Sequence, residues 1–101
     1  MKSNLPSIRI HCTDLQSKFN SNEGGYPAKI DSLGQVCIYD EPASAKSRQP
    51  PGTRSKMYEY FDGYVPVMWL HCFELPSGKL GGSGKMDPKR LLVHGVYYWC
   101  N

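Results

Sequence analysis

Long apolar runs and a large charge excess are both missing from this chain of 101 residues. No stretch approaches the roughly 18 apolar residues of a membrane-spanning helix, and the first residues, MKSNLPSIRIHC, lack the uninterrupted apolar region of a signal peptide. Charged residues make up 21% and hydrophobic residues 40%, a balance that excludes a disordered chain. We therefore expect one folded domain over residues 1–101, located in the cytoplasm and without a membrane partner.

The chain lacks the C-x-x-C spacing of a structural zinc site, although it has four cysteines. Two histidines directly precede a cysteine, but adjacent residues of a strand point to opposite faces and cannot both reach one metal. In a reducing cytoplasm free thiols are favoured over disulfides. The sequence predicts packed thiols, no metal and no cofactor. The residues weighed as ligands are His11, Cys12, Cys37, His71, Cys72, His94 and Cys100.

The usual catalytic patterns are absent as well. No paired carboxylates occur at a useful spacing. The loop Gly81–Lys85 is rich in glycine, but Lys79 and Met86 stand where a nucleotide-binding P-loop needs glycine and a hydroxyl residue. Cys72 lies in an apolar segment, which raises the pKa of a thiol and makes it less reactive. An enzyme with a His/Cys site therefore ranks as the second alternative.

The first half of the chain reads as strands with one short helix. Leu5–Cys12 and Gln35–Tyr39 alternate as half-buried strands do, and Tyr26–Ile30 could form another. A helix of one or two turns fits Asp14–Phe19, because glycine and asparagine follow it. Residues 40–56 combine proline, glycine and small polar side chains, so we expect a long surface loop there.

Two hairpins dominate the second half. An Asp-Gly pair separates Met57–Phe61 from Val65–Leu75, and the pair His94-Gly95 separates Leu91–Val93 from Val96–Cys100. Because apolar residues occupy both alternating sets of Val65–Leu75, this strand should be central. The predicted fold class is α+β, mainly antiparallel β: a curved sheet or partly open small barrel of five or six strands with at most one short helix.

Basic residues gather in two segments, 43–56 and 79–90, against a mildly acidic remainder and a net charge of +3. Aromatic side chains follow or flank these segments, and cations beside aromatic faces are typical of single-stranded nucleic-acid binding. The same residue types also suit protein interfaces. The candidate binding residues are Lys46, Arg48, Arg54, Lys56, Lys79, Lys85, Lys89, Arg90, Tyr58, Tyr60, Tyr97 and Trp99.

The segment GGSGKMDPKRLLVHGVYY, preceded by MWLHCFELPSGKL, resembles the end of small bacterial proteins of phages, plasmids and integron gene cassettes. The resemblance covers roughly Tyr58 to Trp99. It implies an accessory protein of a mobile element with a loop of fixed shape, and it implies no catalytic residue.

The predicted exposed strand edges and the aromatic residues of the C-terminal half are both suited to pairing across an interface. We expect a non-enzymatic binding protein whose partner is another protein or a second copy of the chain. The first alternative is a nucleic-acid-binding protein that uses the two basic segments.

Overall fold

A computed structural model describes residues 4–101. The chain runs through β1 (Ser7–Arg9), α1 (Cys12–Asn20), the 3-10 helix η1 (Pro27–Ser32), β2 (Gly34–Pro42), the 3-10 turn η2 (Ala45–Ser47), β3 (Arg54–Asp62), β4 (Val65–Glu74), β5 (Asp87–Val93) and β6 (Val96–Trp99).

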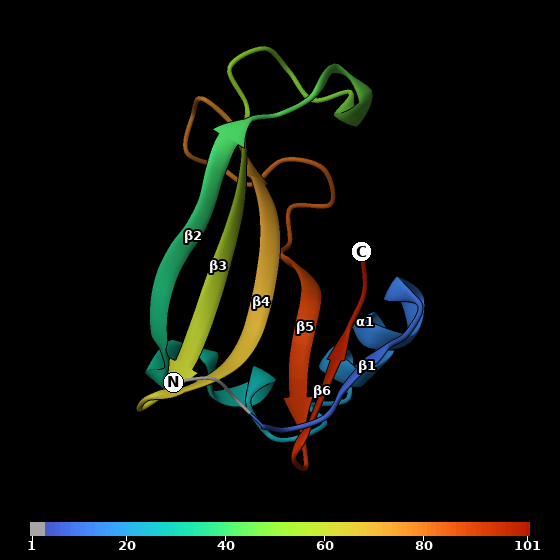
Figure 1. Cartoon of the computed structure of the whole chain (residues 1–101). Coiled ribbons are helices and arrows are strands. Elements are labelled where there is room, and N and C mark those ends of the chain that lie inside the picture. The colour runs from blue at the N-terminus through green and yellow to red at the C-terminus, as the bar shows by residue number, and fades with distance from the viewer. Residues whose placement is uncertain (1–3) are drawn as a thin grey trace.

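The strands form one curved sheet of six strands in the order β1-β6-β5-β4-β3-β2 (Figure 1). Only the short β1 is parallel to its neighbour, and every other pairing is antiparallel. The predicted class, a mainly antiparallel curved sheet with one short α-helix, is thus confirmed. Among the described residues no helix is long and apolar enough to span a bilayer.

The two hairpins form where their turn residues predict. Between β3 and β4 the turn consists of Gly63 and Tyr64, directly after Asp62. Between β5 and β6, His94 and Gly95 have φ angles of 47° and 80°, and two successive positive φ angles are what a type I′ turn requires.

The core lies between helix α1 and one face of the sheet. Leu15 of α1 is fully buried and packs with Met68, Leu70 and Leu91, and Figure 1 shows α1 on the far side of β5 and β6. Side chains alternate along a strand, so the residues between these core positions point to the opposite side of the sheet. We call that side the open face, since no helix of residues 4–101 packs against it.

Several local expectations were wrong. Tyr26–Ile30 forms no strand, because Pro27 begins the 3-10 helix η1 and leaves no extended run to pair. The loop predicted for 40–56 is shorter, since β2 continues to Pro42 and β3 begins at Arg54. The first strand ends at Arg9, and α1 begins at Cys12 instead of Asp14.

The thiols are not all free either. Cys12 and Cys100 form a disulfide with their Cα atoms 5.2 Å apart, within the usual range for this bond. They meet because the chain that leaves β1 stays beside β6, where the Ile10 amide donates a hydrogen bond to the Trp99 carbonyl. Cys37 is exposed and Cys72 is buried, and both are free.

Candidate binding face

Cations and tryptophans alternate across the open face. The strand registers place Arg9 beside Trp99, Trp99 beside Arg90, and Arg90 beside Trp69. The Arg9 guanidinium lies 5.6 Å from the Trp99 ring centre and the Arg90 guanidinium 5.2 Å from the Trp69 ring centre. Both distances lie in the range of cation–π contact. Four neighbouring strands therefore present one row of alternating positive charge and indole.

Glu59 continues this row on β3 and fixes one of its rings. The indole Nε1 of Trp69 donates a hydrogen bond of 2.5 Å to the carboxylate of Glu59, its partner in the β3–β4 register. Since Arg90 packs on the same ring, Trp69 is held from two sides in a single orientation.

A β-bulge adds a second cation beside Arg90. The register of β4 with β5 pairs Trp69 with Arg90 and Leu70 with Pro88, which leaves Lys89 as an extra residue. A bulge re-aims the side chain of the extra residue. Lys89 and Arg90 consequently line the same hollow, although they are neighbours on one strand.

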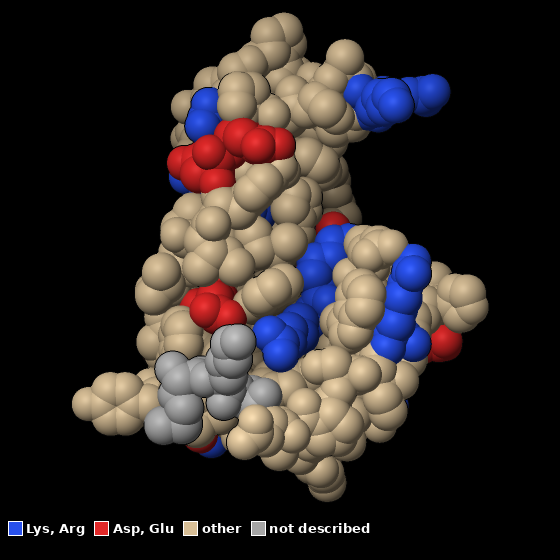
Figure 2. Space-filling view, in the orientation of Figure 1, with Lys and Arg blue, Asp and Glu red and all other residues tan. Residues whose placement is uncertain are grey.

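The hollow has a volume of about 430 Å³. Its lining includes Ser7, Trp69, Lys89, Arg90 and Trp99. Figure 2 shows Lys and Arg side chains inside this depression, between the β2–β4 part of the sheet and the β1–β6 edge.

A second hollow of about 380 Å³ adjoins the first, because Met57 and Trp69 line both. It extends toward β2, where Ile38 and Tyr39 form its wall. Together the two hollows form a groove that crosses the sheet, which we call the open-face groove.

Ser55 and His71 form a polar pair in the second hollow, with 2.7 Å between the serine Oγ and the histidine Nε2. Burial lowers the pKa of His71, the positive charge of Lys89 lowers it further, and Asp87 acts in the opposite direction. The imidazole is therefore neutral at pH 7. Ser55 lies within a strand whose backbone amides serve the sheet ladder, so the pair lacks the free N–H groups of an oxyanion hole.

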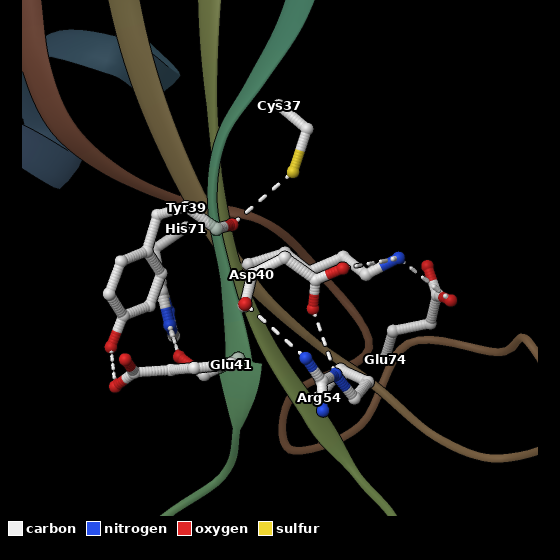
Figure 3. Close-up of polar contacts among 9 residues, drawn as sticks. Cys37, Tyr39, Asp40, Glu41, Arg54, His71 and Glu74 are labelled. Carbon is white, nitrogen blue, oxygen red and sulfur yellow. Dashed lines mark hydrogen bonds and ion pairs between the residues drawn. The ribbon is translucent and has the colours of Figure 1, made fainter.

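The side of β2 and β3 opposite the open face carries an ion-pair cluster (Figure 3). The Arg54 Nε lies 2.9 Å from an Asp40 oxygen, and the Lys56 Nζ lies 3.1 Å from a Glu74 oxygen. The hydrogen bond that Lys56 donates to Glu74 is the main cause of the raised pKa of Lys56. Two of the predicted phosphate-binding cations are thus already paired with carboxylates.

The other predicted binding residues are dispersed. Tyr60 and Tyr97 are buried, so neither offers a stacking face, and Tyr58 packs against the core from the helix side. The loops that follow β2 and β4 lie together at one end of the sheet (Figure 1), where Gln49 contacts Gly81. They carry the exposed residues Lys46, Arg48, Lys79 and Lys85.

Of the predicted set, only Lys89, Arg90 and Trp99 line the open-face groove. Sequence reasoning missed Arg9 and Trp69 as their neighbours. Trp69 was placed correctly on one face of a central strand, but only the strand order shows which cations lie beside it.

The His/Cys pairs do not form a site. His71 lines the open-face groove, whereas Cys72 belongs to the buried residues behind it. Cys12 is engaged in the disulfide and has no thiol, and His94 lies in the exposed β5–β6 turn. Within the part of the chain that the structure describes, no group of three or more His, Cys, Asp or Glu could hold a metal ion.

Strand β2 is the second conspicuous feature. All nine of its residues are exposed, it pairs with β3 on one side, and it ends the sheet on the other. Three large apolar side chains of this edge strand are more than two fifths exposed: Val36 at 51%, Ile38 at 45% and Tyr39 at 41%.

Comparison with known proteins adds no relative. No protein-family model matches the chain, and no curated protein or solved structure matches it. The functional argument therefore depends on the residues and their geometry alone.

Proposed function

We propose that this is a non-enzymatic binding protein that associates with a second copy of itself along strand β2. The observation that carries the proposal is the exposed edge of nine residues with its three apolar side chains. An unpaired edge presents a row of backbone N–H and C=O groups, which a strand of another chain can pair.

The residue pattern of β2 suits a copy of the same strand. An antiparallel pairing centred between Cys37 and Ile38 sets Val36 opposite Tyr39 of the second copy, both on the open face. The same register sets Gln35 opposite Asp40, so the acidic residues of the two copies do not meet. Apolar cross-strand pairs of this kind stabilise a sheet, whereas like charges directly opposite each other destabilise it.

Charge and proline protect only the last positions of β2. Proteins blunt edges with charge, proline and bulges, and here Asp40, Glu41 and Pro42 occupy the last positions of the strand. The bulge lies between Cys37 and Tyr39. The first six residues, Gly34 to Tyr39, carry no charge, and a pairing centred between Cys37 and Ile38 has to accommodate the bulge at that point.

Light scattering on a sizing column tests this function. The wild-type chain should elute as a dimer, and Ile38→Lys should elute as a monomer, because a charge on the edge opposes strand pairing. Tyr64→Lys is the matched control, since Tyr64 is a fully exposed aromatic residue on the β3–β4 turn, away from this edge. A monomeric wild type at high concentration would contradict the proposal.

Cross-linking gives an independent readout of the register. The exposed thiol of Cys37 lies next to the proposed two-fold axis. Mild oxidation should yield a covalent dimer that Cys37→Ser abolishes and Cys72→Ser leaves unchanged. If oxidation gives no Cys37-linked dimer while light scattering shows one, the copies associate through another surface.

Two predictions from the sequence, the accessory role in a mobile element and the cytoplasmic location, remain part of this proposal. The accessory role in a mobile element, which the resemblance of the C-terminal segment implies, stays a prediction. Free thiols were expected because the location was taken to be the reducing cytoplasm, and the Cys12–Cys100 disulfide contradicts that expectation for two of the four cysteines. A cytoplasmic location therefore requires that this bond resist reduction.

A further inference from the structure

We propose that the open-face groove binds single-stranded nucleic acid, with Arg9, Lys89 and Arg90 holding phosphates and Trp69 and Trp99 stacking with bases. The side chains proposed to hold the ligand lie on β1, β6, β5 and β4, and none of them belongs to the edge strand β2. The site shares Lys89 and Arg90 with the basic segment 79–90 that the sequence indicated, and it includes none of the other cations of the two segments.

The charges of the groove are available to a ligand. The described ion pairs engage Lys18, Lys29, Arg54 and Lys56. Within residues 4–101, neither Arg9, Lys89 nor Arg90 has an Asp or Glu oxygen within 4.0 Å. Lys89 donates a hydrogen bond of 3.4 Å to the main-chain oxygen of Asn101, and the Arg90 guanidinium lies 4.0 Å from the Tyr97 ring centre. Neither contact comes from an Asp or Glu side chain, so the three cations, two of them lining one hollow, are complementary to an anionic chain.

The aromatic rings of the groove are suited to unpaired bases. Trp69 and Trp99 are partly exposed, and Trp69 is fixed by its hydrogen bond to Glu59. Rings and guanidinium planes are the surfaces on which single-stranded bases stack, whereas a duplex keeps its bases stacked inside. Trp69 on β4 and Trp99 on β6 are separated by strand β5. Because neighbouring strands lie about 4.8 Å apart, the two indoles are about 10 Å apart across the sheet.

The dimensions favour a chain over a single nucleotide. Each hollow, at about 430 and 380 Å³, lies in the size range of a small-ligand site. Because Met57 and Trp69 line both, the groove continues from Ser7 beside β6 to Ile38 on β2. A ligand that fills it crosses all six strands of the sheet.

Fluorescence anisotropy with a labelled mixed-sequence DNA 12-mer tests the site. Three phosphate contacts predict a slope of about −2 in log affinity against log salt concentration. Binding should therefore weaken by about 100-fold for a roughly tenfold rise in salt, from about 20 to about 200 mM. A hairpin duplex and a mononucleotide serve as competitors, and both should compete at least tenfold more weakly than the single strand. The proposal would be overturned if the 12-mer did not bind, or if the duplex or the mononucleotide competed as strongly as the single strand.

Variants locate the binding. Arg9→Gln and Lys89→Gln should each reduce the salt slope by about 0.7, and Trp99→Leu should weaken binding without changing that slope. Lys46→Gln and Lys85→Gln are the matched controls on the exposed loops. If the loop variants lose affinity and the groove variants do not, the loops bind and this inference is wrong.

One further variant separates the two proposals. Val36→Lys, which also places a charge on the β2 edge, should bind the 12-mer as the wild type does, since Val36 is exposed and lines neither hollow of the groove. A monomeric variant with full binding supports the groove whatever the fate of self-association. Loss of binding together with the dimer would show that the site needs two copies, against the single-chain groove proposed here.

Discussion

Cys12 and Cys100, 88 residues apart in the sequence, are joined by a disulfide that ties the first residue of helix α1 to the residue after strand β6. The bond closes nearly the whole chain into one loop. It also fixes the helix that covers the core against the edge of the sheet that carries Arg9 and Trp99.

Removing this bond should lower the free energy of unfolding. A disulfide that closes a loop of about 100 residues restricts the unfolded chain by about 4 to 5 kcal/mol. We expect urea unfolding of Cys12→Ser to show a loss of about 4 kcal/mol, and Cys37→Ser, which removes a free exposed thiol, to show almost none. Equal stability of the two variants would mean that the bond does not form. Titration against a glutathione buffer would then show whether the wild-type bond survives in a reducing compartment.

Stability should fall as the pH drops below neutrality, because of His71. Burial lowers the pKa of this histidine in the folded chain below its ordinary value of 6.5, so the unfolded chain takes up the proton first. The stabilising effect is complete above pH 6.5 and is lost progressively as the pH falls below it. Urea midpoints at pH 7.5, 6.5 and 5.5 should decline for the wild type and vary less for His71→Gln. A variant with the same decline as the wild type would assign the effect to other groups.

The parts of the fold that could be predicted are local. The pair Asp62-Gly63 located the β3–β4 hairpin, whose turn is Gly63 and Tyr64, and the pair His94-Gly95 forms the β5–β6 turn, because a few neighbouring residues set the turn geometry. The Cys12–Cys100 bond and the bulge at Lys89 depend instead on register between segments distant in sequence. No local pattern encodes that register, so the sequence suggested free thiols and placed the cations in loops.

The two free thiols should differ in reactivity. Cys72 is buried, and burial is the main reason its pKa is raised, so little thiolate is present at pH 7. With a chromogenic disulfide reagent at low protein concentration, the native chain should titrate one thiol, Cys37, and the chain in denaturant should titrate two. Cys37→Ser should abolish the native reaction. A fast reaction of that variant would place Cys72 within reach of solvent.

Gly24 and Gly25 offer a matched pair for measuring the contact between the chain after α1 and strand β5. Both have positive φ angles, 81° and 86°, but a Cβ at Gly24 would lie 2.5 Å from the Leu92 carbonyl oxygen, whereas one at Gly25 would meet no atom within 4 Å. Gly25→Ala should therefore cost about 1 to 2 kcal/mol from backbone strain alone. Gly24→Ala should cost clearly more in the same urea unfolding experiment, since the backbone of β5 must move to make room. Equal losses would show that the connection yields at little cost and that Gly24 is present only for its backbone conformation.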